Sequence, residues 1–205
     1  MDQRASSTIY LIGGTPGAGK TTLGKALAAR LGVHSFTIDD LVTGAIAVTT
    51  PESHPGLHAL RKMPHIEYYT NSSIEQLKQD ATLRHEATWP MVKSIIRKHH
   101  QQKTGIVIDG WHIRPAWVAA LNIPEVQSYW IVINEQILEQ REKHNASFFQ
   151  ASPQPEKMFQ NFMARSLWYN QFIEEEATAF GMKILRQTGD VSTEEFCEMI
   201  LGTHF

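Results

Sequence analysis

The sequence predicts an α/β fold in which helices cover both faces of a parallel β-sheet. Five short segments with the composition of buried strands alternate with segments whose apolar residues recur at helical spacing. A glycine-rich stretch also joins the first strand segment directly to the first helical segment. Because connections between neighbouring parallel strands are right-handed, this alternation places helices on both faces and ligands at the carboxyl ends of the strands.

Each expected element follows from its local sequence. The run 8–13 is continuously apolar, as in a buried parallel strand, and the helical pattern over 20–31 ends at Gly32. The last helix starts at a capping box formed by Ser192 and Glu195. The expected strands are 8–13, 35–38, 105–109, 128–133 and 183–185, and the expected helices are 20–31, 72–100, 115–121, 136–144, 155–179 and 193–201.

The chain shows no internal repeat and no linker, so we expect one domain over residues 1–205. Two segments, 43–71 and 144–155, are long or poorly periodic, which is typical of substrate loops and lids. We expect a helical substrate-binding insertion over about 43–100 and a lid over about 144–155.

Composition restricts the setting of the protein. A formal net charge of −2 and 42% hydrophobic residues describe a soluble globular chain without general attraction to nucleic acid or membrane. The single cysteine, Cys197, excludes an internal disulfide and is expected to be a buried helix residue. No signal-peptide core and no apolar run near the ~20 residues of a membrane span are present. We expect a cytoplasmic protein; the sequence indicates no oligomeric state.

Residues 14–21 carry the most specific signal. They read Gly-Thr-Pro-Gly-Ala-Gly-Lys-Thr, which fits the nucleotide-phosphate pattern G-x-x-x-x-G-K-[ST] between a strand and a helix. Lys20 is expected to reach the β- and γ-phosphates, and Thr21 to place its hydroxyl on Mg²⁺. A glycine-rich turn without a ligand is the alternative. The expected ATP-binding residues here are Gly14, Thr15, Pro16, Gly17, Ala18, Gly19, Lys20, Thr21 and Thr22.

Asp39 and Asp40 follow the second expected strand. A strand beside the phosphate loop delivers its carboxyl-end side chains near the γ-phosphate, where a carboxylate can accept a proton from an attacking hydroxyl. We expect Asp39 to be this base and Asp40 to cap a helix beginning at Leu41 or to contact Mg²⁺ through water. The alternative is that both residues only cap that helix.

Asp109 ends the third expected strand and precedes Gly110. A carboxylate there can hold Mg²⁺ through water as the partner of Thr21, whereas the alternative is a plain Asp-Gly turn. Arg114 follows at the same edge of the sheet and could bind an anionic acceptor. Trp111 and His112 are expected to be packing residues.

Together these segments resemble the P-loop small-molecule kinases of the nucleoside-monophosphate-kinase-like group. Residues 107–115, Val-Ile-Asp-Gly-Trp-His-Ile-Arg-Pro, are most similar to the 2-phosphoglycerate-kinase-like proteins. The resemblance implies an adenylate-kinase-like three-layer sandwich with a five-stranded parallel sheet, an ATP site and a lid that carries arginines. It also implies that the stretch after the last strand contacts the adenine, here Gln187, Gly189 and Asp190.

The arginines fit this resemblance only in part. A lid usually brings closely spaced arginines, whereas Arg141 stands alone here. Its guanidinium could still stabilise the charge that spreads over the transferring phosphoryl group, with an exposed helix residue as the alternative. Arg165, on a long aromatic-rich helix, is the second choice for this role and is also expected to contact the acceptor. Arg61 and Arg84 lie in the expected acceptor region and suit a phosphorylated or carboxylated acceptor, although solvated surface cations are the commoner explanation.

Three functional classes fit these residues. The first is an ATP-dependent kinase that transfers the γ-phosphoryl group to a hydroxyl or acidic group of a small anionic metabolite. The second is a nucleotide-hydrolysing regulatory or binding protein, for which no switch segment stands out. The third is a kinase for nucleosides, nucleotides or nucleic-acid ends, and the absence of a basic block counts against nucleic acid.

Overall fold

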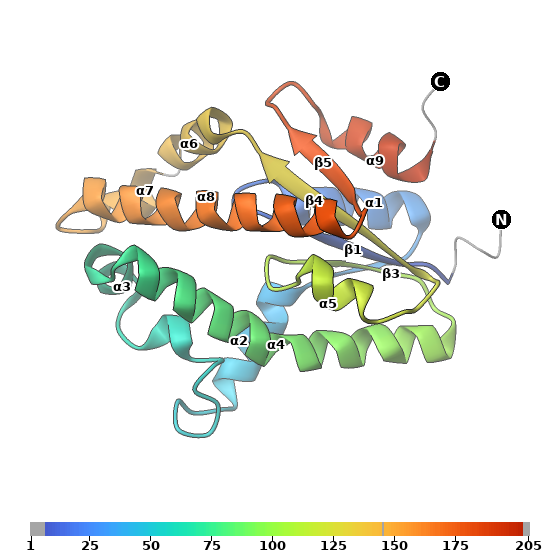
Figure 1. Ribbon diagram of the computed structural model, residues 1–205, viewed down its shortest axis with the longest axis horizontal. Helices are drawn as coiled ribbons and strands as arrows, with labels where there is room; N and C mark the ends of the chain where they lie inside the picture. The colour runs from blue at the N-terminus through green and yellow to red at the C-terminus, as the bar shows by residue number, and fades with distance from the viewer. Residues whose placement is uncertain (1–6, 145, 203–205) are drawn as a thin grey trace.

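Five parallel strands form one sheet in the order β2-β3-β1-β4-β5 in the computed structural model, which describes residues 7–144 and 146–202 (Figure 1). The strands are β1 (Ile9–Gly14), β2 (His34–Thr37), β3 (Ile106–Asp109), β4 (Val126–Ile133) and β5 (Lys183–Gln187). The central strand β1 pairs with β3 and β4, with Ile9 opposite both Ile106 and Val126. The predicted α/β class and five-stranded parallel sheet are confirmed.

Helices form a layer on each side of this sheet. Alternate side chains of β1 face opposite cores, Ile9 and Leu11 toward one and Tyr10 and Ile12 toward the other. The first core is closed by α2 (Ile38–Ala47), α4 (Ile74–Gln102), α5 (Pro115–Ala119) and α8 (Pro155–Ala179). The second is closed by α1 (Lys20–Leu31), α6 (Glu135–His144) and α9 (Thr193–Leu201), the helix that carries the buried Cys197.

A third, smaller cluster stands beside the end of the sheet where β4 points. It joins α3 (His65–Asn71), the first turn of α4, α7 (Ala146–Gln150) and the first turns of α8, which lie together at the left of Figure 1. Its buried members are Tyr68, Tyr69, Leu77, Phe149 and Met158. Aromatic packing of this kind gives the region a core of its own beside the carboxyl ends of the strands.

Two expected elements need correction. The helix expected to start at Leu41 starts at Ile38, with Thr37 as its extended N-cap residue, so Asp39 and Asp40 occupy its first turn. Carboxylates are favoured there because the helix dipole leaves positive charge at the N-terminus. The segments expected to be irregular also contain α3, the short 3₁₀ turn η1 (Ala59–Arg61) and α7.

Parts of the predicted lid and N-terminus lie outside the described residues. These are Asn145 within the lid segment 144–155, and residues 1–6. Among the described helices, none has the length and apolar character needed to cross a membrane.

Candidate active site

The phosphate loop connects β1 to α1 at the carboxyl edge of the sheet. Gly17 and Gly19 have φ angles of 78° and 98°, in the left-handed region that glycine adopts without steric cost. Gly19 is also the N-cap residue of α1, which begins at Lys20. The loop thus leads directly into a helix N-terminus, where free N–H groups and the helix dipole favour phosphate.

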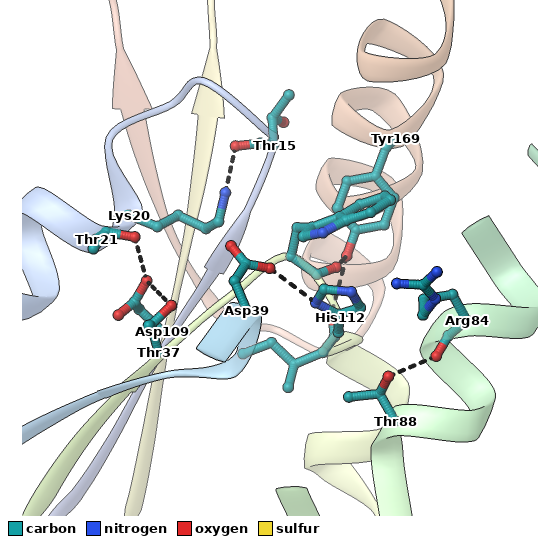
Figure 2. A network of polar contacts seen from close by, with 12 residues as sticks. Thr15, Lys20, Thr21, Thr37, Asp39, Arg84, Thr88, Asp109, His112 and Tyr169 are labelled. Carbon is teal, nitrogen blue, oxygen red and sulfur yellow. Dashed lines mark hydrogen bonds and ion pairs between the residues drawn. The ribbon is translucent and has the colours of Figure 1, made fainter. Parts of the chain in front are cut away.

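Lys20 is buried within this loop. Its Nζ donates a hydrogen bond to the backbone oxygen of Thr15 at 2.7 Å, and only 8% of the residue is exposed (Figure 2). Burial lowers the pKa of Lys20 to about 8, against the opposing attraction of the Asp39 and Asp109 carboxylates. The ammonium group is therefore held close to the loop by one neutral acceptor.

Thr21 and Asp109 meet as expected for a magnesium site. Thr21 Oγ1 donates to Asp109 Oδ1 at 2.6 Å (Figure 2). Asp109 Oδ2 is buried and has no hydrogen-bond partner among the described residues. Burial raises the pKa of the Asp109 carboxyl, although the hydrogen bond from Thr21 lowers it. A hydroxyl beside an unsatisfied carboxylate oxygen fits Mg²⁺, which takes few protein ligands and keeps several waters. The described residues contain no group of three or more metal-ligating side chains.

A cavity of about 450 Å³ opens beside the loop. The loop side is formed by Pro16, Gly17, Gly19, Lys20, Thr21 and Thr22, and the facing side by Asp39, Val42, Thr43, Leu60, Arg61, His65, Tyr69, Arg84, Trp111, His112 and Arg165. The structure thus brings the predicted base and three of the predicted acceptor arginines together with the phosphate loop. A cavity of this size suits a small molecule.

Of the three arginines, Arg61 is exposed, whereas Arg84 and Arg165 are buried. Arg84 is 5% exposed, and within residues 7–144 and 146–202 its Nε and Nη2 have no hydrogen-bond partner. Burial, with a contribution from nearby Arg61, lowers its pKa to about 10, so it remains a cation at neutral pH. Arg165 is 3% exposed and lies over the rings of Tyr69 and Trp111, with Nη1 donating to the Tyr69 hydroxyl. Neither buried guanidinium group forms an ion pair with a carboxylate of the described residues, so both could pair with a bound anion.

Asp39 lies at the mouth of the cavity, with 61% of its side chain exposed. Oδ1 is 3.5 Å from Nδ1 of His112 (Figure 2). Burial lowers the pKa of His112 to about 3, so this contact is between a carboxylate and a neutral imidazole. Partial desolvation raises the pKa of Asp39, against the attraction of Lys20. The carboxylate is thus somewhat more basic than an ordinary aspartate.

Helix α6 brings Arg141 to the back of the loop. Arg141 Nη1 donates to the backbone oxygen of Gly17 at 3.0 Å. Glu142, also on α6, lies so near Gly17 that a Cβ on this glycine would stand 2.7 Å from its Oε1. The predicted lid arginine therefore contacts the backbone of the phosphate loop.

Besides Gly14, Thr15, Ala18, Asp109 and Arg141, which lie in or beside the phosphate loop, five predicted residues do not line the cavity. Asp40 lines a separate apolar groove, and Arg114 lies over the rings of Trp117 and Phe172 while donating to Thr82. In the predicted adenine segment, Gln187 is buried and bonds to Gly189 and Val191, and Asp190 accepts a hydrogen bond from Thr188. The roles proposed for Gln187, Gly189 and Asp190 stay predictions.

Sequence reasoning gave a packing role to two residues that also line the cavity, and overlooked others. Trp111 and His112 pack against other rings, yet both border the cavity. Their position shortly after Asp109, at the carboxyl end of a strand, could have indicated that they border the site. Tyr69 and His65 were missed because they come from α3, which was not predicted.

Comparisons with known proteins agree with this fold. No family model matches the chain, and no curated protein matches it. Among solved structures, a gluconokinase from Sinorhizobium meliloti has a TM-score of 0.55 at 13% identity, covering 96% of this chain and 90% of that one. Shikimate kinases from Acinetobacter baumannii, in complex with shikimate, and from Bacteroides thetaiotaomicron have TM-scores of 0.51 and 0.52, both at 16% identity. They cover 97% and 96% of this chain and 92% and 97% of theirs.

At these identities the likeness establishes the fold alone. The chain has the P-loop NTPase fold that these small-molecule kinases share, and it aligns with them over nearly their whole length. The resemblance to 2-phosphoglycerate-kinase-like proteins is not tested by these structures and stays a prediction.

Proposed function

We propose that this protein is an ATP-dependent kinase that transfers the γ-phosphoryl group to a hydroxyl or acidic group of a small anionic metabolite. One observation carries the proposal: a carboxylate, Asp39, and three arginines line the same cavity as the phosphate loop. The fold shared with solved small-molecule kinases supports it. A donor site and an acceptor site that share a cavity are what direct phosphoryl transfer requires.

Asp39 supplies the base in this proposal. Its raised pKa strengthens it as a proton acceptor, and 61% of its side chain is exposed. The neutral His112 beside it does not compete for the carboxylate as a fixed ion-pair partner would. An acceptor hydroxyl placed next to Asp39 could therefore give up its proton as its oxygen attacks.

The arginines supply the acceptor's binding energy. Arg61, Arg84 and Arg165 would pair with the acceptor's phosphate or carboxylate groups, and Arg84 would gain the partners that it lacks here. Thr21 and Asp109 would hold Mg²⁺, which would neutralise part of the phosphate charge. Lys20 would move from the Thr15 carbonyl to the phosphates, and Arg141 would stabilise the transferring group.

The two alternative functions, a nucleotide hydrolase and a nucleic-acid-end kinase, explain fewer of the residues that line this cavity. A nucleotide hydrolase uses water as its acceptor, and binding water does not require several guanidinium groups in the cavity beside the phosphate loop. A kinase for nucleic-acid ends requires basic surface beyond the cavity, which a net charge of −2 does not favour.

The test pairs metabolite phosphorylation with adjacent aspartate variants. A thermal-shift screen with MgATP and small hydroxylated acids or phosphate esters identifies acceptors, and phosphorylation is then measured with each. Asp39→Asn should lower turnover ~10²–10⁴-fold with little loss of ATP affinity, as for a missing general base. Asp40→Asn is the matched control, because Asp40 lies outside the cavity. If Asp40→Asn is the more damaging change at equal stability, the two roles are reversed; ATP hydrolysis at the same rate with and without every acceptor would point to a hydrolase.

A further inference from the structure

Asn170, on α8, makes a polar contact to the phosphate loop that no motif in the sequence indicates. Its Oδ1 accepts a hydrogen bond from Thr15 Oγ1 at 2.5 Å and a second one from the backbone N–H of Ile133 at 2.9 Å. Ile133 is the last residue of β4, and Thr15 is the first residue after β1. One side-chain oxygen therefore ties the loop to the end of the neighbouring strand.

The direction of both hydrogen bonds follows from chemistry. A backbone N–H can only donate, so the Asn170 atom that faces Ile133 must be the oxygen. The Thr15 hydroxyl, which faces the same oxygen, must then donate to it. Thr15 is completely buried, so its hydroxyl has no exposed surface at which water could replace this acceptor.

The contact continues from Thr15 to Lys20. Thr15 offers its hydroxyl to Asn170 and its carbonyl oxygen to Lys20 Nζ, at 2.7 Å (Figure 2). Fixing the hydroxyl restricts the orientation of the residue and thus the position of its carbonyl. Asn170 on α8 therefore helps to fix the conformation of the loop backbone and the position of the Lys20 ammonium group.

We infer that Asn170 is a positioning residue for the nucleotide site, acting through Thr15 on the phosphate loop and on Lys20. The inference rests on the proposed function, because it assumes that the loop binds ATP. Asn170 itself need not touch the nucleotide. Its contribution is to hold the loop in one conformation before binding, so that less ordering is left for the ligand to achieve.

The test measures MgATP affinity by titration calorimetry in variants of this hydrogen bond. Asn170→Leu removes the acceptor at similar volume and should weaken MgATP binding by about 5- to 30-fold, equivalent to about 1–2 kcal/mol. Thr15→Val removes the donor from the other end and tests the same bond if Asn170→Leu does not fold. Both changes delete the hydrogen bond between Thr15 and Asn170, and Asn170→Leu also removes the acceptor of the Ile133 N–H. The double variant should therefore bind MgATP about as well as Asn170→Leu alone.

A matched control separates positioning from stability. Asn161 lies on the same helix and donates to the backbone oxygens of Tyr69 and Ser72. Asn161→Leu should lower the melting temperature and leave MgATP affinity unchanged, whereas Asn170→Leu should change both. If wild type binds MgATP and Asn170→Leu binds it equally well, or if the penalties of Asn170→Leu and Thr15→Val add, only the inference is overturned. If the wild type binds no MgATP, the proposed function itself fails.

Discussion

Replacing Arg84 by methionine should make the ligand-free protein more stable. Arg84 is 5% exposed, its Nε and Nη2 have no hydrogen-bond partner, and it comes from α4 into the cavity (Figure 2). Methionine keeps the length of the side chain and removes the charge. The change therefore removes an unpaired buried cation and retains most of the apolar contacts of the stem.

The lowered pKa of Arg84 gives the size of the expected gain in stability. A pKa lowered by burial from 12.5 to about 10 makes the charged form about 3 kcal/mol less favourable in the folded chain than in the unfolded chain. This cost applies at neutral pH, because the group is protonated in both states. Arg84→Met should remove part of this cost, so we expect its free energy of unfolding to rise by about 1–3 kcal/mol and its melting temperature by about 3–10 °C.

Urea unfolding and thermal melts, each with and without sodium sulfate, are the assays. Sulfate stabilises proteins in general, so the informative quantity is the difference between wild type and Arg84→Met, which should gain less from it. Arg97→Met is the control, because Arg97 is exposed on the same helix and its loss should change stability by no more than about 0.5 kcal/mol. A loss of stability in Arg84→Met, with Arg97→Met unaffected, would show that Arg84 serves the fold and would refute the reasoning.

The remaining predictions concern the loop, the lid and two histidines. Lys20→Ala should abolish turnover without lowering the melting temperature, since the buried ammonium has one neutral partner; near-normal phosphorylation would contradict the nucleotide site. Arg141→Ala should lower turnover far more than it lowers ATP affinity. Arg141→Lys should restore turnover only partly, because an ammonium group lacks the planar fork of a guanidinium. Unchanged turnover in Arg141→Ala would assign the role to another arginine. Protease should cut the segment 144–155 in the free protein and spare it when ATP and acceptor are both bound; equal cutting would argue against a lid. Burial lowers the pKa of His112 to about 3 and that of His85 well below 6.5. The free energy of unfolding should therefore fall as the pH drops below 6.5, by up to about 2 kcal/mol per histidine at pH 5. His112→Asn should lose less stability than wild type between pH 6.5 and pH 5, and an equal loss would contradict this assignment.

The parts of the site that could be predicted depend on local sequence and on strand order. The phosphate loop is a contiguous motif, and its glycines adopt the left-handed angles that the pattern requires. Thr21 and Asp109 are 88 residues apart, yet their meeting follows from placing both at the carboxyl edge of one parallel sheet. Asp39 was predicted at this edge for the same reason, although the helix start around it was not.

The parts that could not be predicted depend on packing between distant helices. Arg84 and Arg165 were expected near the site, but their burial was not, because solvent exposure is the usual outcome for arginine on an amphipathic helix. The packing that buries them joins distant elements: α8 contacts α3 and α4, and Arg165 lies over Tyr69 of α3 and over Trp111. No periodicity distinguishes them from exposed arginines. The neutral state of His112 has the same origin, because it depends on burial that local sequence does not encode.

Helix α8 gives the two halves of the site a common frame. Within six consecutive residues, Arg165 enters the cavity, the Tyr169 hydroxyl donates to the backbone oxygens of Trp111 and Ile113, and Asn170 accepts from Thr15. These contacts reach the acceptor wall, the segment after β3 and the phosphate loop from less than two turns of one helix. Phosphoryl transfer requires the attacking and transferred atoms to be brought within about 3–3.5 Å, and elements that move independently cannot hold that distance. A single rigid helix that contacts all three parts restricts their relative motion, so α8 contributes to the proposed reaction through geometry as well as through the charge of Arg165.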